Sequence, residues 1–189
     1  VATRIRPRLR ARLDGSIVTG RVLPTRAGSV VLRVEGRTRR LRVSSAGRFR
    51  ARLGMLRAGK QIAILGTGTM ALAALEAAQR LAADGIDAAA VNARFIKPLD
   101  ERMLAELVSS CRVLVTYEEG SVANGFGAYL AARLQLTHPE VRVVPLGIPD
   151  ELVVQAARVD QLDRYGLSPA RIAASAKAAM TLVDEDFPR

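Results

Sequence analysis

A continuous apolar run, a turn of small residues and a long alanine- and leucine-rich segment stand next to one another near the middle of the chain. The run covers residues 62–65, the turn 66–69 and the segment 70–83, which carries apolar residues at helical spacing. Uninterrupted apolar character is typical of a strand buried on both faces of a parallel sheet. The pattern predicts strand, tight turn and helix, and Asp84-Gly85 is a normal end for that helix.

The remainder of the chain repeats this unit. Asp100 is expected to begin one of the later helices, and Ser168 to cap the last one with Pro169 as its first residue. Strands that alternate with helices predict βαβ units with parallel strands and right-handed crossovers. The fold class is therefore an α/β, three-layer α/β/α sandwich with a mainly parallel sheet. Strands are predicted at 86–91, 112–117 and 141–146, and helices at 101–110, 128–134, 161–165 and 169–182.

The first part of the chain has a different pattern, in which apolar and arginine positions alternate with a period of two. Alternation is clearest at 30–35, 40–43 and 48–53, and residues 16–23 could add another strand. This predicts a small antiparallel meander with one apolar and one arginine-rich face, too small to be secure alone. Residues 1–13 combine many like charges with little to bury, so they are predicted to be a disordered basic arm.

Charge separates the two parts as clearly as hydropathy does. Residues 1–60 contain seventeen basic and two acidic side chains, a net charge of +15, whereas the remainder carries −4 within a total of +11. Such asymmetry indicates two separate pieces. We predict a basic arm at 1–13, a small β-rich basic segment at 14–55 and an α/β domain at 56–189.

Three interpretations of the basic segment stay open. An arginine-coated sheet could bind phosphate backbones with a salt-dependent affinity, although Phe49 is its one aromatic residue and base-stacking platforms are missing. The segment could instead be a β module with a solvated basic face. It could also be a sequence that is not a native neighbour of the α/β part. Of these three interpretations, phosphate-backbone binding is the least favoured.

The turn Gly66-Thr67-Gly68-Thr69 is a candidate anion site, because it presents backbone N–H groups at a helix start. It lacks the third glycine of a dinucleotide fingerprint and the Gly-Lys-Ser/Thr of a phosphate-binding loop. A tight strand-to-helix turn that needs small residues explains the same pattern more simply.

Glu118 and Glu119 are adjacent carboxylates at the predicted carboxyl end of a strand, where ligands of open α/β sheets bind. A buried pair could act as a general acid and base. Neighbours on an extended segment point to opposite faces, so we expect no cooperating pair. One carboxylate is instead expected to fix the following loop through hydrogen bonds to backbone N–H groups.

The remaining candidate groups point to no catalysis. His138 precedes Pro139 in a predicted surface loop and has no visible serine or cysteine partner, and Cys111 is the one cysteine, expected to be a buried structural thiol. We identify no metal-ligand cluster. No apolar run reaches the roughly 18–20 residues of a membrane helix, and no signal-peptide pattern opens the chain, so the α/β part is expected to be cytoplasmic. Because the chain opens on Val1, it is expected to be a fragment.

Four segments in this order and spacing resemble the C-terminal domain of 1-deoxy-D-xylulose-5-phosphate synthase, a thiamine-diphosphate enzyme of the transketolase family. The most specific is Asn-Ala-Arg-Phe-Ile-Lys-Pro-Leu-Asp at residues 92–100. The others are residues 64–70, Glu118-Glu119-Gly120 with the Gly-Phe-Gly of 125–127, and residues 146–150. The resemblance covers roughly residues 56–182 and none of the basic segment.

The resemblance implies a non-catalytic part of a transferase. In that family the synthase joins pyruvate, after decarboxylation, to glyceraldehyde 3-phosphate in isoprenoid and thiamine biosynthesis. Thiamine diphosphate and Mg²⁺ are held by two preceding domains, while the C-terminal domain supports the homodimer and the neighbouring pyrimidine-binding domain. The resemblance thus assigns this chain no catalytic, cofactor-binding or metal residue, its partners are the missing domains, and the isolated chain is expected to be inactive.

One departure from the family pattern affects the loop after residue 150. Gln155-Ala156-Ala157 stands where the family has a Glu-His-Gly-Ser-like run, which puts any contact made by that run in doubt.

The alternative function is that of a polyanion- or nucleic-acid-binding protein, which would act through the arginine-rich first part of the chain.

Overall fold

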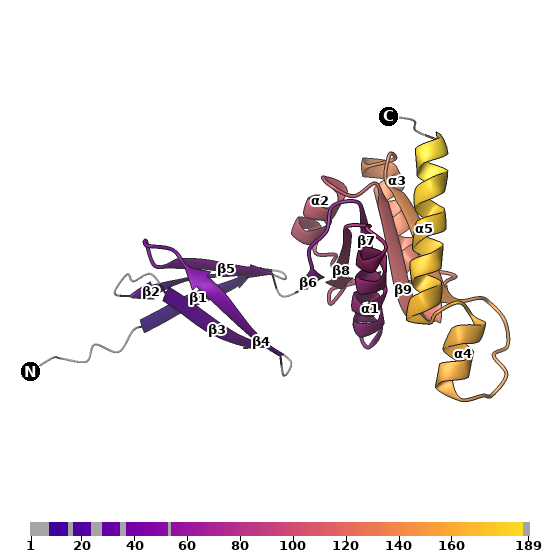
Figure 1. Cartoon of the computed structure of the whole chain (residues 1–189), viewed down its shortest axis with the longest axis horizontal. Coiled ribbons are helices and arrows are strands. Elements are labelled where there is room, and N and C mark those ends of the chain that lie inside the picture. Colours follow the sequence, from indigo (N-terminus) through magenta and orange to yellow (C-terminus); the bar gives the residue numbers. More distant parts are fainter. Residues whose placement is uncertain (1–7, 15–16, 24–27, 35–36, 53, 187–189) are drawn as a thin grey trace, which may run out of the picture. The chain divides into compact units, whose positions relative to one another are not determined.

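The computed structural model describes residues 8–14, 17–23, 28–34, 37–52 and 54–186 (Figure 1). The chain divides into two compact units, Val1–Gly54 (unit 1) and Met55–Arg189 (unit 2). The division lies next to the boundary that we predicted between residues 55 and 56.

The described strands of unit 1 are antiparallel and form two small sheets. The first sheet has the order β1-β2-β5, formed by β1 (Arg8–Asp14), β2 (Ile17–Leu23) and β5 (Arg48–Arg52). The second pairs β3 (Gly28–Val34) with β4 (Arg37–Val43). Unit 1 is therefore β-rich.

Two features of unit 1 differ from the sequence-based expectations. Residues 8–13 were predicted to be disordered but belong to β1, which pairs with β2 along all seven of its residues. The other residues of the predicted arm, 1–7, lie outside the described residues. The strands also do not form a single meander, because β5 pairs with β2 and not with β4. Their alternating pattern predicts strands but does not choose between partners.

Unit 2 contains a five-stranded sheet with the order β10-β9-β7-β8-β6. Four strands are parallel, namely β7 (Ile62–Gly66), β8 (Ala88–Asn92), β9 (Val113–Ser121) and β10 (Arg142–Ile148). At one edge β6 (Met55–Arg57) pairs with β8 in the antiparallel direction. The sequence did not predict β6, because three residues are too short to show a period.

Helices cover both faces of this sheet. On one face α1 (Met70–Ala83) and α5 (Pro169–Asp186) pack on Ile62 and Ile64, and on the other α2 (Glu101–Val108) and α3 (Phe126–Thr137) pack on Ala63 and Leu65. All five residues of β7 are buried. The predicted three-layer α/β/α sandwich is confirmed, and Figure 1 shows the sheet between its helices.

Two local signals at helix starts, Asp100 and Pro169, agree with the structure. The amide of Met103 donates to Asp100 Oδ1 at 3.1 Å, so Asp100 caps α2 as predicted. Pro169 is the first residue of α5, as predicted. The Ser168 hydroxyl donates to Asp163 Oδ1 at 2.8 Å, so capping of α5 by Ser168 stays a prediction. A further short helix, α4 (Arg158–Arg164), lies between β10 and α5 and buries none of its residues.

Candidate functional site

The carboxyl ends of β7, β8, β9 and β10 lie at the same edge of the unit 2 sheet, because these strands are parallel. Ligands of open α/β sheets bind at this edge. The turn 66–69 follows β7 there, and Glu118 and Glu119 lie near the end of β9. The polar side chains at this carboxyl edge are therefore the main candidates for a ligand site.

Glu118 holds the start of α3. Its side chain is buried, and its two carboxylate oxygens accept hydrogen bonds from the backbone amides of Phe126 and Gly127, each at 2.9 Å. A negative charge at a helix N-terminus is stabilised by the unpaired amides and the helix dipole. A Cβ atom on Gly125 would lie 2.5 Å from Glu118 Oε1, so glycine is needed in this loop. The expectation that one carboxylate fixes the loop is confirmed.

Glu119 has different partners. Thr69 Oγ1 donates to its Oε2 at 3.1 Å, and Arg158 Nε donates to its Oε1. The hydrogen bond from Arg158 is the largest effect and lowers the pKa of Glu119. Burial opposes it, and the smaller effect of the hydrogen bond from Thr69 again lowers the pKa. Glu119 is thus a carboxylate that joins β9 to α4 and to the start of α1. The two glutamates do not form a cooperating pair, as we expected.

The candidate anion turn uses much of its polar backbone within the chain. The Thr67 amide donates to Tyr117 O at 3.0 Å, and the amides of the first three residues of α1 donate to carbonyls of the turn at 2.9 to 3.3 Å. A Cβ on Gly66 would lie 2.5 Å from Met70 O, which explains the small residue. The carboxylate of Glu119 already accepts a hydrogen bond from the Thr69 hydroxyl. These contacts favour the simpler explanation, and anion binding by Gly66, Thr67, Gly68 and Thr69 stays a prediction.

Tyr117 lies in β9 near this edge, where it pairs with Gly66 at the end of β7. Its side chain is fully buried, and its hydroxyl donates to Leu167 O. Burial, reinforced by the charge of Glu119, raises the pKa of Tyr117 to about 12. Its phenol stays neutral and holds the loop before α5, so it is not poised to transfer a proton.

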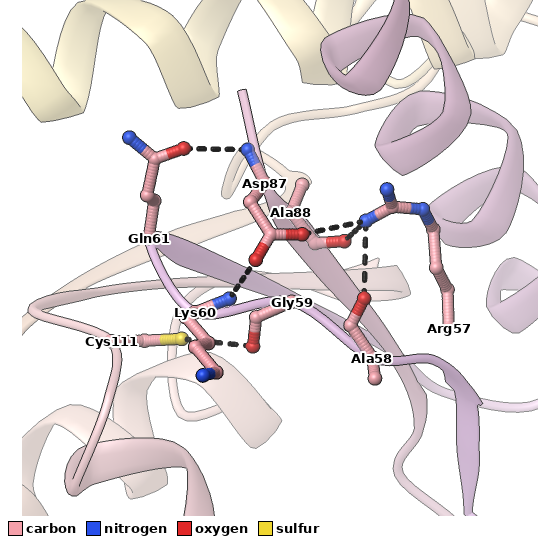
Figure 2. A network of polar contacts seen from close by, with 8 residues as sticks. All are labelled: Arg57, Ala58, Gly59, Lys60, Gln61, Asp87, Ala88 and Cys111. Atoms are coloured by element: carbon pink, nitrogen blue, oxygen red, sulfur yellow. Dashed lines mark hydrogen bonds and ion pairs between the residues drawn. The ribbon is translucent and has the colours of Figure 1, made fainter. Parts of the chain in front are cut away.

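A second polar cluster lies at the opposite edge of the sheet, where β7 and β8 begin (Figure 2). The Asp87 carboxylate accepts from the Lys60 amide at 3.0 Å and lies 3.6 Å from Arg57 Nη1. Gln61 Oε1 accepts from the Asp87 amide at 2.6 Å, and Arg57 also donates to Ala88 O. These bonds fasten the connection between β6 and β7 to the start of β8.

A depression of about 300 Å³ adjoins this cluster, lined by polar and apolar side chains that include Lys60, Gln61, Ser110 and Arg112. The neighbouring Cys111 is a free thiol, 1% exposed, with its Sγ 4.0 Å from Gly59 O. Burial raises the pKa of Cys111 to about 11, so it is protonated near neutral pH. The expectation of a buried structural thiol is confirmed.

The other candidate groups assemble no reactive site in the part of the chain that the structure describes. His138 lies half-buried at the end of α3, with Nδ1 3.1 Å from Thr137 Oγ1. Among the described residues, no group of three His, Cys, Asp or Glu side chains could hold a metal ion. No helix within the described ranges is long and apolar enough to cross a bilayer.

Comparison with known proteins identifies the family. The model of the transketolase C-terminal domain matches residues 52–172, which is more than half of the chain. The chain belongs to the transketolase C-terminal domain family. Residues 1–51 lie outside this match, and the comparisons give no support to the nucleic-acid alternative.

Several curated relatives of this transketolase C-terminal domain carry the name 1-deoxy-D-xylulose-5-phosphate synthase. The protein of Synechococcus elongatus is 39% identical over 118 residues, which is 62% of this chain and 19% of that protein. The protein of Symbiobacterium thermophilum is 36% identical over 133 residues (70% and 20%), and a probable chloroplastic synthase of Oryza sativa is 41% identical over 120 residues (62% and 17%). The chain thus spans about a fifth of the length of these relatives, and the resemblance found in the sequence is confirmed.

A solved structure shares the fold of this transketolase C-terminal domain. It is described as "Split gene transketolase, inactive beta4 tetramer" and is 34% identical, with a TM-score of 0.63 over 68% of this chain and 42% of that one. The similarity agrees with the α/β architecture of unit 2.

The residues present in this transketolase C-terminal domain do not fit a magnesium-diphosphate site. Both oxygens of Glu118 bind backbone amides, Glu119 is paired with Arg158 and Thr69, and no metal-binding group occurs among the described residues. No step of thiamine chemistry is therefore assigned to these side chains.

The sequence analysis did not identify Arg158 as a partner of Glu119, because nothing local in an exposed helix indicates a partner 39 residues earlier.

Proposed function

We propose that this chain supplies the C-terminal domain of an enzyme like 1-deoxy-D-xylulose-5-phosphate synthase and is catalytically incomplete alone. The observation that carries the proposal is the family match over residues 52–172, together with 36–41% identity to proteins of that name. In this proposal thiamine diphosphate and Mg²⁺ are held by other domains of the same enzyme, on this polypeptide or on another chain. Those domains condense pyruvate with glyceraldehyde 3-phosphate.

The role proposed for unit 2 is assembly. Exposed apolar side chains support it, since single surface apolar residues are common but a group of them indicates a contact surface. In the loop after β8, Phe95 is 41% and Ile96 38% exposed, and after β10, Leu152 is 96% exposed. Tyr129, 39% exposed, lies beneath Lys97 Nζ at 5.6 Å from its ring centre. We propose that this edge contacts the missing cofactor-binding domains and supports a homodimer of the whole enzyme.

The solved relative also supports the proposal that the chain is catalytically incomplete alone. It is described as a split gene product and as an inactive tetramer of one chain type. We infer that a chain of this kind can exist apart from the rest of its enzyme, and that it gains activity only on meeting the missing part. A cytoplasmic location stays a prediction.

Reconstitution tests the proposal directly. The 189-residue chain is mixed with a Synechococcus elongatus synthase from which the C-terminal domain has been removed, and product formation from pyruvate and glyceraldehyde 3-phosphate is measured with thiamine diphosphate and Mg²⁺. We expect neither part alone to be active and the mixture to turn over. The detached C-terminal domain of the Synechococcus protein is the positive control.

Two results contradict the proposal. Turnover, or calorimetric binding of thiamine diphosphate, by the 189-residue chain alone would show a site that the described residues do not form. Failure of this chain to restore activity where the Synechococcus domain succeeds would show that the family likeness does not extend to assembly. Leu152→Ser with Phe95→Ser probes the proposed contact edge: both side chains are exposed, so the fold is expected to persist while reconstitution falls.

A further inference from the structure

One face of the three-stranded sheet in unit 1 collects arginine positions. The register pairs Arg10 with Arg21 and Arg21 with Arg48, so three arginines are direct neighbours across three strands. Residues i and i+2 of a strand share a face. The same face therefore also includes four further arginine positions, at 8, 12, 50 and 52, and Asp14 is its one acidic position among the described strands.

Among the described strands, the opposite face of this sheet has no charged position. The register that gathers the arginines places only apolar residues and one glycine on the other side of the described strands, at positions 9, 11, 13, 18, 20, 22, 49 and 51. Arg21 and Arg48 are exposed. Strand pairing therefore places seven of the fifteen arginine positions of unit 1 on one face of this sheet, the arginine face, and none on its other face.

This concentration of charge is not balanced within the chain. Directly opposed like charges destabilise a sheet, and arginines two residues apart along a strand are separated by only about 6.6 Å. Unit 1 contains fifteen arginines against two acidic residues, whereas unit 2 has fourteen basic and sixteen acidic residues. The rest of the chain thus carries too little negative charge to neutralise unit 1, and the arginine face must attract anions from solution.

We propose that the arginine face binds the phosphate backbone of duplex nucleic acid without sequence preference. Duplex DNA carries a negative charge about every 1.7 Å of its axis, and its binding is driven by the release of condensed counterions. A single strand fits less well, since binding it relies on aromatic stacking. Phe49, the one aromatic residue of unit 1, occupies a position on the opposite face. This binding would be separate from the assembly role of unit 2 and does not rest on it.

Fluorescence anisotropy of a labelled, random-sequence DNA duplex tests the proposal with the full chain over a series of salt concentrations. The logarithm of the affinity should fall linearly with the logarithm of the salt concentration. Neutralising about five phosphates gives a slope of about −4.5, from the rule of about −0.9 per phosphate contact.

Arg21→Gln with Arg48→Gln removes two neighbouring charges from the centre of the face. The slope of log affinity against log salt concentration should become shallower by about 2. The affinity at low salt should fall by about tenfold or more. The change also relieves like-charge repulsion, so the thermal transition should be retained. Arg21→Lys with Arg48→Lys keeps both charges and should bind within about threefold of the unchanged protein, because lysine also pairs with phosphate.

The matched control removes the same charge from unit 2. Arg112→Gln with Arg171→Gln replaces two exposed arginines and should change the affinity by less than about twofold. An equal loss in both double variants would overturn the proposal, since binding would then follow net charge alone. No duplex binding at low salt would overturn it as well, as would tighter binding to heparin or to phosphatidylserine vesicles than to the duplex.

Discussion

Units 1 and 2 both contain sheets, but their charge and burial differ. The central strand β7 of unit 2 is buried along its whole length and is covered by helices on both faces. Unit 1 has no helix among its described residues, and one face of its larger sheet consists largely of arginine positions. We infer that unit 2 is stabilised by two apolar layers, whereas the stability of unit 1 depends on the ions around it.

The largest expected effect comes from Gly59, which lies against the backbone of β8. A Cβ atom there would be 2.2 Å from the carbonyl carbon of Ala88 and 2.4 Å from the Ala89 nitrogen, and β8 cannot move away without disturbing its pairing with β6 and β7. Gly59→Ala should lower the free energy of unfolding of unit 2 by about 3 kcal/mol or more, and leave unit 1 unchanged.

Cys111 provides the measurement for unit 2. It is the one cysteine, is buried, and has its pKa raised to about 11, so thiol labelling should report the opening of unit 2 alone. Gly120→Ala is the matched control, because its nearest atom, Glu118 Oε2, would be 3.9 Å away. A control as unstable as Gly59→Ala would contradict the steric explanation.

The next effect concerns Glu118, the buried carboxylate at the start of α3. Glu118→Gln retains the shape but replaces one accepting oxygen by an NH₂ group that faces a backbone amide. We expect unit 2 to lose about 2 kcal/mol of stability, since a buried donor is left unpaired. Glu140→Gln, on the exposed loop before β10, should change stability by less than about 0.5 kcal/mol. Equal losses would show that charge, and not the two amide bonds, is what matters.

Salt should separate the two units. Screening weakens repulsion between exposed charges, so raising the salt concentration should slow hydrogen exchange in β2 and β5 several-fold and leave β7 and β9 unchanged. Arg21→Gln with Arg48→Gln should reduce the salt effect in β2 and β5, because it removes both directly opposed pairs, Arg10–Arg21 and Arg21–Arg48. A salt effect of the same size in both units would remove the distinction drawn between them.

The smallest effect should be the pH dependence of the Glu119–Arg158 pair. The folded-state pKa of Glu119 is lowered from its ordinary value of 4.5, so its contribution to stability is present above that value. It is lost as the pH falls through the lowered folded-state pKa. Both side chains are exposed, and exposed pairs contribute little.

Hydrogen exchange in α4 can detect this small contribution. Exchange should be faster in Glu119→Gln than in the unchanged protein near neutral pH, and the two should converge in acid. A difference that persists at low pH would show that α4 is held by something other than the ionised pair.

Much of unit 2 could be predicted from the sequence, because its signals are local. The bounds of α1, the cap at Asp100 and the anchoring of a loop by one carboxylate near the end of β9 each depend on residues close together in the chain. The site predictions were limited for the same reason. Which glutamate turned inward, and which met Arg158, depended on contacts that no local pattern contains.

The sequence by itself determined that a parallel α/β sandwich follows a basic, strand-forming segment. Hydrophobic periodicity and charge are properties of residues that are adjacent in the chain, so they need no tertiary structure to be recognised. Only the tertiary structure decided that β5 pairs with β2, that β6 is antiparallel at the sheet edge, and that Arg10, Arg21 and Arg48 are neighbours. The physical reason is that any extended strand offers the same backbone donors and acceptors. The choice among partners is made by the packing of the whole unit and not by the strand itself.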